Sequence, residues 1–397
     1  MEFRVRILHI SQSMDPRWGG PPKITACIAS SQAAIGHEVS IAARAEQGRE
    51  DSIKALLGTI PGMDKVAMEL LEPVSPLREI LSYKAGDGLE ELVRSSDVVH
   101  IHNVWDPFNI PAAKLARKHS KPHYILLNGM LDPWCMNEKR LKKNILMKLR
   151  WREFLDGATA LHCGNRDEIE LIKPLGLTAP REMIPNGVFP DEIAPPTEDA
   201  GFFKDHPELA DLKIMLFMSR LHHKKGLDHL AESFAIFARD NDDVHLVVAG
   251  PEEGSGDDFR ARISRHGIDH RVHMVGPVYG PQKWQLLHAS ECFVLTSHQE
   301  GFSVAITEAL GCSLPCLVSS GCHYPEVQEA GAGRVTSLDH QEIASAMHEI
   351  FQDESTRQEM ARAANDLVMS RFTWPKVAEQ TVAIYEKALG PEGATGN

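Results

Sequence analysis

Two glutamates, Glu300 and Glu308, are eight positions apart in the segment EGFSVAITEAL at residues 300–310. The preceding run, CFVLTS, is typical of a strand buried on both faces, and the apolar residues after Gly301 suit the start of a buried helix. We therefore predict a strand, a glycine turn that carries Glu300, and a helix that carries Glu308. The unpaired N–H groups at the start of such a helix suit an anion or the oxygens of a sugar.

A second stretch, SRLHHKKG at residues 219–226, has the same predicted layout but carries positive charge. KIMLFMS, which leads into it, indicates a buried strand, and GLDHLAESFAIF, which follows, has the apolar spacing of a helix. Arg220 and Lys225 flank the loop, which ends at Gly226. Two cations beside a strand-to-helix turn provide the charge and the donors that a diphosphate requires. The spacing alone leaves open a second interpretation, in which both cations are simply solvated.

These stretches resemble family 4 of the retaining glycosyltransferases, which has the GT-B fold. The two glutamates of its signature, with seven residues between them, match Glu300 and Glu308, and its loop of Arg, four residues, Lys and Gly matches residues 220–226. Further matches follow in family order: GG at 19–20, GHEV at 36–39, DVVHIHNVW at 97–105, GMLDPW at 129–134 and IPNGV at 184–188. The resemblance extends over nearly the whole chain. It implies an α/β fold with two Rossmann-like domains whose parallel sheets face a central cleft.

The elements that must position these residues divide into two predicted domains. A length of 397 residues favours two domains of ordinary size. We predict an N-terminal, acceptor-binding domain over residues 1–190 and a C-terminal, donor-binding domain over residues 191–372. A last helix, about residues 373–390 with a bend at Pro375, is expected to cross back onto the first domain, as the resemblance implies. Strands and helices alternate in both domains, which indicates parallel sheets.

The resemblance also implies roles for individual residues. Arg220 and Lys225 would balance the charge that grows on a departing diphosphate, and Glu300 would act with them in catalysis by fixing sugar hydroxyls or a phosphate. Glu308 would bind the ribose hydroxyls. The residues expected to contact the donor are Gly20, Gly250, Val278, Tyr279, Phe302, Ser303, Val304 and Glu308. For Gly20 an ordinary tight turn is the other interpretation, and Val278 and Tyr279 do not distinguish uracil from guanine.

Three residues of the first domain are candidates for the acceptor side. His102 ends the predicted buried strand DVVHIH, at the edge of the sheet where ligands bind in α/β folds. A histidine there could orient an acceptor hydroxyl, but a hydrogen-bonded structural group is the favoured interpretation. His100 and His102 would lie on one face of that strand, so a metal is conceivable, but the sequence shows no third ligand. Asn128 stands where many family members have a histidine or arginine, and it cannot take up a proton near neutrality. Trp134 suits either stacking on a sugar or packing within a loop.

The segment KRLKKNILMKLRWR, residues 139–152, contains seven cations and no acid. Leu141, Ile145 and Leu149 recur within it at helical spacing. An apolar stripe beside a basic surface fits a peripheral contact with anionic lipid headgroups. A surface helix whose apolar stripe packs on its own sheet fits the pattern equally well.

Composition limits the classes of partner. The formal net charge of −13 disfavours nucleic acid. Residues 1–190 contain 25 Lys and Arg against 23 Asp and Glu, whereas the remainder contains 17 against 32, so the two halves are expected to face different partners. No apolar run approaches the ~20 residues of a membrane span, and the N-terminus lacks a signal-peptide core. The seven cysteines lack zinc-site spacing. We therefore expect a cytoplasmic protein with free thiols, with possible peripheral contact at the inner membrane face.

The resemblance thus implies a retaining glycosyltransferase that moves a sugar from a nucleotide diphosphate sugar, a UDP-sugar being favoured, to a hydroxyl acceptor. The acceptor would be a sugar or a lipid-linked sugar in bacterial-type polysaccharide or glycolipid assembly. No cofactor beyond this co-substrate and no metal are expected, because the two cations and the helix start can stabilise a diphosphate without one. Three other interpretations stay open: a glycosidase that uses both glutamates, a sugar-nucleotide epimerase of the same fold, and a non-catalytic nucleotide-sugar-binding protein. Release of free sugar, donor turnover without acceptor, and donor binding without transfer would identify them in turn.

Overall fold

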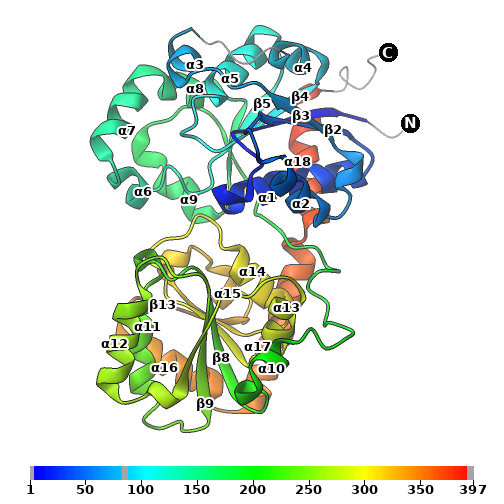
Figure 1. The fold of residues 1–397 in the computed structure, drawn as a ribbon. Coiled ribbons are helices and arrows are strands. Elements are labelled where there is room, and N and C mark those ends of the chain that lie inside the picture. Colours follow the sequence, from blue (N-terminus) through cyan, green and yellow to red (C-terminus); the bar gives the residue numbers. More distant parts are fainter. Residues whose placement is uncertain (1–3, 83–87, 391–397) are drawn as a thin grey trace. The chain divides into compact units, whose positions relative to one another are not determined.

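The computed structural model describes residues 4–82 and 88–390. The chain forms two compact units. The first comprises the residues up to Asn186 together with those from Trp374, and the second comprises Gly187–Thr373. Each unit is built on one parallel β-sheet with helices, as Figure 1 shows, so the predicted α/β class is confirmed.

The sheet of the first unit has seven strands in the order β3-β2-β1-β4-β5-β6-β7. Its strands are β1 Arg6–Ser11, β2 Glu38–Arg44, β3 Ala67–Leu71, β4 Val98–His102, β5 His123–Leu126, β6 Ala160–Cys163 and β7 Arg181–Met183. The central strand β1 pairs in parallel with β2 and β4, with Ile7 opposite both Val39 and Val98. The first five strands in chain order and β6 follow apolar runs of the sequence, whereas the short strand β7 was not predicted.

Helices surround this sheet. They are α1 Gly20–Ala34, α2 Glu50–Gly58, α3 Pro76–Ser82, α4 Leu89–Ser95, α5 Asn109–Lys118, α6 Pro133–Asn137, α7 Arg140–Leu146, α8 Arg152–Asp156, α9 Arg166–Leu171 and α18 Trp374–Leu389. A π-helical turn, Met147–Trp151, joins α7 to α8. The helix α9 begins as predicted at Asn165, whose side chain accepts from the Glu168 N–H at 2.7 Å.

The last helix, α18, packs against α1 within the first unit. Tyr124 donates its hydroxyl to the Ile384 carbonyl at 2.8 Å, and Gln32 Nε2 donates to Thr381 Oγ1 at 2.8 Å. The bend predicted at Pro375 is wrong in its detail. α17 ends at Arg371 and α18 begins at Trp374, so Pro375 stands in the first turn of a new helix, where its missing N–H costs nothing.

Beneath α18, four buried histidines belong to one chain of hydrogen bonds that runs through Gln32 and Tyr385: His9, His100, His102 and His162. His9 Nδ1 lies 2.9 Å from His102 Nε2, and His162 Nδ1 lies 3.2 Å from His100 Nε2. The Tyr385 hydroxyl lies 2.6 Å from His100 Nδ1. Burial lowers the pKa of His9 and His162 to about 4 and the pKa of His100 and His102 well below its ordinary value. All four rings are therefore neutral at neutral pH.

This chain of neutral histidines predicts loss of stability in mild acid. Each histidine has a lower pKa in the folded than in the unfolded state, so the unfolded state binds more protons as the pH falls below about 6.5. Between pH 7.5 and 5.5 each such histidine should cost about 1.4 kcal/mol of unfolding free energy. Urea unfolding followed by tryptophan fluorescence reports mainly on the first unit, which holds all tryptophans except Trp284. Equal unfolding free energies at the two pH values would contradict this account.

The sheet of the second unit has six parallel strands in the order β10-β9-β8-β11-β12-β13. Its strands are β8 Lys213–Met218, β9 Val244–Ala249, β10 Val272–Gly276, β11 Cys292–Leu295, β12 Cys316–Ser319 and β13 Gly333–Thr336. Its helices are α10 Phe202–Asp205, α11 Leu227–Phe237, α12 Gly256–His266, α13 Gly280–His288, α14 Val304–Gly311, α15 Glu326–Glu329, α16 His340–Phe351 and α17 Glu354–Arg371. Only β13 among these strands was not predicted from an apolar run.

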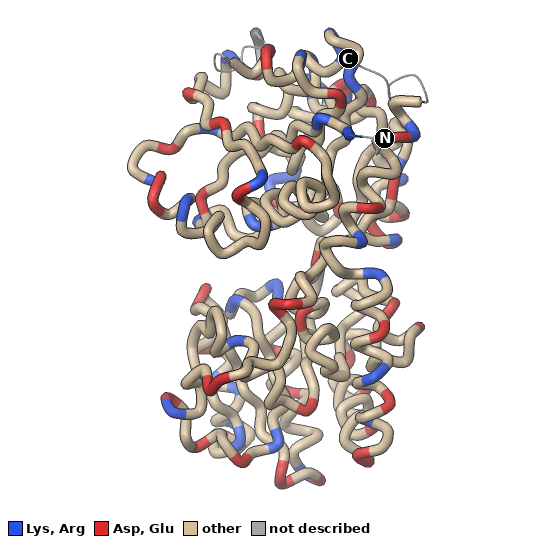
Figure 2. The backbone as a smooth tube through the Cα atoms, turned by 90° about the vertical axis from the view of Figure 1, so that its right-hand side faces the viewer, with Lys and Arg blue, Asp and Glu red and all other residues tan. Residues whose placement is uncertain are grey.

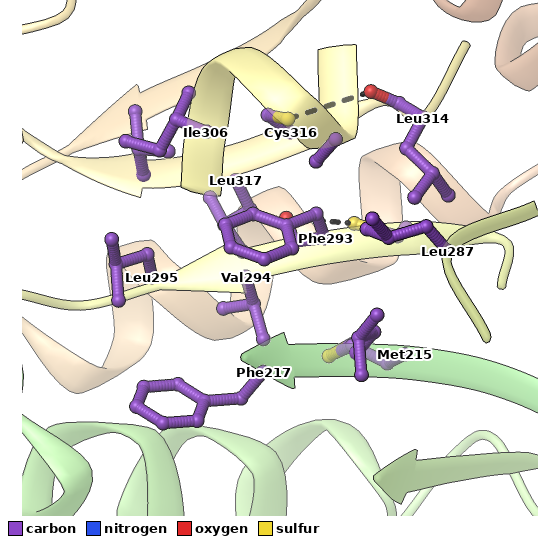
Figure 3. Packing of buried hydrophobic residues seen from close by; sticks show 14 of the residues in the cluster. Met215, Phe217, Leu287, Phe293, Val294, Leu295, Ile306, Leu314, Cys316 and Leu317 are labelled. Carbon is purple, nitrogen blue, oxygen red and sulfur yellow. Dashed lines mark hydrogen bonds between the residues drawn. The ribbon is translucent and has the colours of Figure 1, made fainter. Parts of the chain in front are cut away.

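The core of the second unit fixes the strands that carry the candidate site. Figure 3 shows side chains from β8, β11, β12 and α14 packed together, among them Phe217, Phe293 and Ile306, each fully buried. Burial of such a side chain contributes about 1.5–3 kcal/mol. The start of α14 is thus held firmly against the ends of the neighbouring strands.

Surface charge and cysteines complete the description. Figure 2 shows acidic and basic positions interspersed over each unit. The seven cysteines are free, as predicted, and all except Cys135 are buried. Within residues 4–82 and 88–390, the helices are too short or too polar to cross a membrane.

Candidate functional site

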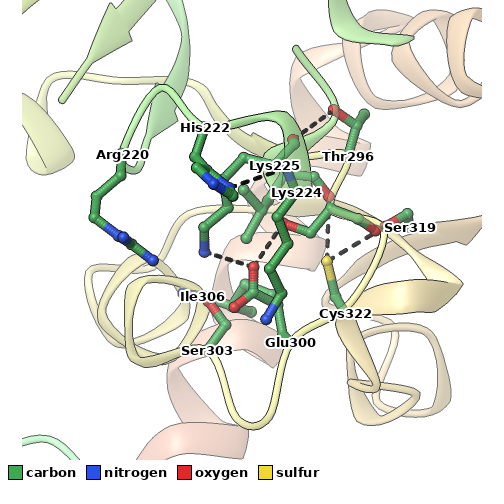
Figure 4. Close-up of polar contacts among 12 residues, drawn as sticks. Arg220, His222, Lys224, Lys225, Thr296, Glu300, Ser303, Ile306, Ser319 and Cys322 are labelled. Atoms are coloured by element: carbon green, nitrogen blue, oxygen red, sulfur yellow. Dashed lines mark hydrogen bonds and ion pairs between the residues drawn. The ribbon is translucent and has the colours of Figure 1, made fainter. Parts of the chain in front are cut away.

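The two predicted chemical stretches meet in the second unit through a buried ion pair. Lys225 lies in the turn between β8 and α11, and Glu300 lies in the turn between β11 and α14. Lys225 Nζ lies 2.6 Å from Glu300 Oε1, and both side chains are about nine-tenths buried. Because β8 and β11 are neighbouring parallel strands, their carboxyl ends bring these turns together (Figure 4).

Glu300 is held as a carboxylate. Burial raises its pKa, but the Lys225 charge, with hydrogen bonds from Lys225 and Ser297, outweighs burial and leaves the pKa below its ordinary value. Ser297 Oγ donates to Glu300 Oε1 at 2.6 Å, and the Glu300 N–H donates to the Gly321 carbonyl at 2.8 Å. Both the position and the charge of this side chain are therefore fixed by the fold.

Arg220 differs from Lys225 in its exposure. Its side chain is 55% exposed and its Nη1 lies 2.6 Å from Glu253 Oε2. Figure 4 shows the Arg220 and Lys225 side chains on the same side of the loop, facing the turn that carries Glu300 and Ser303. An anion in front of this turn would meet one exposed cation, Arg220, and one buried cation, Lys225.

The start of α14 offers backbone donors to the same place. Ser303 caps the helix by accepting from the Ile306 N–H at 3.4 Å. Within the described part of the chain, the N–H groups of Phe302, Ser303 and Val304 are recorded with no hydrogen-bond acceptor. Free N–H groups at a helix start bind anions and sugar oxygens. The predicted set Glu300, Phe302, Ser303 and Val304 thus lies together.

Glu308 lies further along α14, and its partner was not found from the sequence. Lys283 Nζ of α13 lies 2.8 Å from Glu308 Oε1, with the two side chains 16% and 11% exposed. Lys283 also lies over the ring of Trp284, with Nζ 3.8 Å from the ring centre. No spacing rule connects Lys283 with Glu308, because α13 and α14 are separated by β11. The only sequence signal for this contact is that Lys283 lies in the helix that follows Val278 and Tyr279, the residues predicted to contact the base.

The base-reading candidates lie at the start of α13. Val278 is 9% exposed, whereas Tyr279 is 70% exposed. An exposed tyrosine ring is available to a ligand, whereas the buried Val278 offers chiefly its backbone.

Two glycines allow the loops to approach one another. Gly226 has φ +64°, and a Cβ there would lie 1.9 Å from the Thr296 carbonyl oxygen. Gly250 follows β9, and a Cβ there would lie 1.8 Å from the Ser219 carbonyl oxygen. Any side chain at either position would push the Arg220–Lys225 loop away from its neighbour.

Gly20, the donor-side candidate of the first unit, begins α1. A Cβ at Gly20 would have its nearest neighbour, Ile24 Cδ1, 3.9 Å away, so the fold itself does not demand glycine there. The preceding Gly19 has φ +77° and makes the turn. Space beside Gly20 is compatible with a ligand that approaches the backbone.

The acceptor-side candidates are distributed around the end of β4. Asn128, with φ +51°, donates from Nδ2 to Asn103 Oδ1 at 2.8 Å. Trp134 is half-buried at the start of α6. His102 is 1% exposed and bonded to His9, so direct contact between His102 and an acceptor is contradicted by its burial.

Beside Asn103 lies a hollow of about 340 Å³ in the first unit. It is lined by Gln12, Trp18, Asn103, Trp105, Asp106, Met130, Cys135 and Lys143. Lys143 Nζ donates to the Cys135 carbonyl at 2.5 Å and lies 5.4 Å from the centre of the Trp105 ring. Two indole rings and a cation suit a sugar that carries negative charge. The sequence motifs did not indicate this hollow, because its lining comes from four separate segments.

Comparisons with known proteins identify the family of the chain. Residues 200–367 match the model of glycosyl transferases group 1, and residues 19–187 match the glycosyl transferase 4-like domain. The glycogen synthase of Mycobacterium tuberculosis is 25% identical over 412 residues, covering 96% of this chain and 94% of that protein. The GDP-mannose:cellobiosyl-diphosphopolyprenol alpha-mannosyltransferase of Xanthomonas campestris is 22% identical, with coverage of 97% and 98%.

The fold has solved counterparts. The structure of Anabaena Alr3699/HepE in complex with UDP and glucose superposes with a TM-score of 0.71 at 19% identity, covering 96% of this chain and 99% of that one. The two family models together account for both units of the chain. The chain therefore belongs to the GT4-type glycosyltransferases, the glycosyl transferases group 1, and has their GT-B fold.

Proposed function

We propose that the enzyme transfers a sugar, with retention of anomeric configuration, from a nucleoside diphosphate sugar to a hydroxyl of a lipid-linked saccharide. The observation that carries the proposal is the Lys225–Glu300 pair, fixed and buried at the free start of α14 beside Arg220. A diphosphate accepts from cations and backbone N–H groups, and a sugar hydroxyl donates to a fixed carboxylate. The turns at residues 220–226 and 300–304 thus have partners for both parts of the donor.

Each side chain would have a defined task in the transfer. The bond between the sugar C1 and the diphosphate oxygen breaks, and the acceptor oxygen bonds to C1 on the same face. The acceptor proton passes to the departing phosphate. Lys225 and Arg220 stabilise the negative charge that develops on the diphosphate. Glu300 keeps Lys225 in place, and Glu308, held by Lys283, accepts hydrogen bonds from the ribose.

The acceptor proposal depends on the first unit. Lys143 lines the hollow beside Asn103 and belongs to α7, the basic helix on which Leu141 and Ile145 are exposed. A saccharide on a lipid diphosphate would place its charged group near Lys143 and its lipid beside α7. The Xanthomonas campestris relative is named for a diphosphopolyprenol acceptor, which supports the same class here.

A peripheral membrane contact at residues 139–152 follows from the exposure of its apolar side chains. Leu141, Ile145 and Leu149 are 77%, 50% and 60% exposed, so the stripe does not pack on its own sheet. Lys139, Arg140, Lys142 and Lys148 are recorded with no ion pair to any described residue. We propose that this face rests on an anionic membrane, at the cytoplasmic side.

Vesicle co-sedimentation tests this contact. The double variant Leu141→Glu with Leu149→Glu should bind vesicles containing anionic lipid at least tenfold more weakly than the unmodified enzyme, because it loses buried apolar area and gains repulsion. Leu77→Glu, a change at a leucine that is 66% exposed on α3, is the matched control. Equal binding of all three proteins to these vesicles would contradict the membrane proposal. So would the absence of binding by the unmodified enzyme at low salt.

Thermal-shift screening against UDP-, GDP- and ADP-sugars tests the donor. A donor at 100 times its dissociation constant should stabilise the second unit by about 2.7 kcal/mol, and a UDP-sugar is expected to give the largest shift. NMR of the product sugar then reads the anomeric configuration. An epimerase would convert the donor in the absence of an acceptor. A binding protein would show a thermal shift with the donor but would not convert it.

A further inference from the structure

Three potential metal ligands meet on the surface of the second unit, beside the donor loops. Asp228 and His229 lie in the first turn of α11, directly after Gly226, and His298 lies between β11 and α14. One ligating atom of each residue lies within 4.8 Å of the others. His229 Nε2 lies 3.8 Å from Asp228 Oδ2, and the His229 and His298 ring centres are 5.2 Å apart. Two imidazoles and a carboxylate therefore converge.

A fourth residue orients the central ligand. His340, the first residue of α16, has its Nε2 3.1 Å from His229 Nδ1. α11 packs against α16, so this contact is anchored by two helices (Figure 1). Histidines that bind metals almost always have their second ring nitrogen held by a hydrogen bond.

The buried histidines of the first unit offer a competing site. His9, His100 and His102 also satisfy the spacing for three ligands. Both ring nitrogens of His9 and of His100 are occupied by hydrogen bonds, and all three rings are at most 1% exposed. An ion there would have to break an existing network. By contrast, His298 is exposed, and Asp228 and His229 are half-buried, so an ion can reach them from solution.

We propose that Asp228, His229 and His298 form a binding site for a divalent transition-metal ion such as Zn²⁺, with His340 as the residue that positions His229. Two nitrogen ligands and one carboxylate, with room for water, suit Zn²⁺ or its neighbours. Mg²⁺ and Ca²⁺ prefer oxygen ligands and are disfavoured.

The position of the site gives metal binding a consequence for the donor loops. The His298 N–H donates to the Lys224 carbonyl at 2.8 Å, and Lys225 is the next residue. The neighbouring Ser297 donates to Glu300. An ion that joins His298 to the start of α11 would restrain both turns of the Lys225–Glu300 pair. Ion binding is independent of the proposed function, whereas an effect on donor affinity rests on it.

Competition with a coloured zinc chelator tests the site on tag-free, metal-stripped enzyme. We expect one Zn²⁺ per chain, affinity at least tenfold weaker in His298→Ala and in Asp228→Asn, and no competition by Mg²⁺. The His270→Ala change, also at an exposed histidine of this unit, is the matched control and should leave the affinity unchanged. Circular dichroism verifies that each variant is folded.

Two results would overturn the proposal. One is zinc affinity in His298→Ala equal to that of the unmodified enzyme. The other is loss of binding in His9→Gln alone, which would move the ion to the buried cluster. Titrating the donor nucleotide with and without Zn²⁺ is a separate measurement. A chain that binds zinc but no nucleotide would retain the metal site and refute the proposed function.

Discussion

Replacing Lys225 with alanine is expected to lower kcat by about 10²-fold or more, and to destabilise the second unit by roughly 3–5 kcal/mol. The loss of rate follows from losing a fixed cation at the departing diphosphate. The loss of stability follows because Glu300, which is about nine-tenths buried, would lose the cation that offsets the cost of burying its charge. Transfer assays and chemical unfolding measure the two effects on the same protein.

A second substitution separates these effects. Lys225→Ala combined with Glu300→Gln also removes the carboxylate charge of residue 300. The amide of the new glutamine can still form a hydrogen bond with Ser297. The double variant should therefore be more stable than Lys225→Ala alone, yet at least as slow. A Lys225→Ala enzyme with unchanged kcat would exclude the proposed role of this lysine.

Arg220→Ala should also slow transfer by about 10²-fold, but with almost no loss of stability. Its side chain is 55% exposed, and a surface pair such as that with Glu253 contributes about 0–1 kcal/mol. Arg220 therefore gives the cleaner probe of function, because any loss of rate cannot be attributed to unfolding. Steady-state kinetics and a thermal melt suffice.

The control for Arg220 is Arg334 on β13. Arg334 Nε lies 2.6 Å from Glu349 Oε2, so its removal also breaks a surface ion pair at the same distance. Arg334→Ala should retain full activity. Equal loss of activity in both variants would show that Arg220 acts through general surface charge rather than at the diphosphate.

Much of the fold was predictable because its strands are short, apolar and regularly separated by helices. Continuous apolar runs such as KIMLFMS and CFVLTS are typical of strands buried on both faces, and this pattern indicates a parallel sheet. β7 and β13 were missed because they lie at sheet edges, where burial on both faces is not required. Glycine turns between strand and helix placed Lys225 and Glu300 correctly near each other, since neighbouring parallel strands end together.

Contacts between distant segments could not be predicted. Lys283 reaches Glu308 across a strand, and His9 completes the cluster of His100 and His102 from another strand altogether. Such pairs depend on strand order and helix orientation, which local periodicity does not contain. His102 is 1% exposed and bonded to His9, which agrees with the interpretation of His102 as a hydrogen-bonded structural group rather than as a contact for an acceptor.

Isothermal titration calorimetry of the preferred nucleoside diphosphate against the matching free nucleoside tests the donor site most directly. The account predicts that the diphosphate binds the unmodified enzyme about 100-fold more tightly than the nucleoside, a difference of about 2.7 kcal/mol. In Arg220→Ala most of that difference should disappear. Equal affinities for diphosphate and nucleoside, or a difference unaltered by Arg220→Ala, would contradict a diphosphate held by this loop.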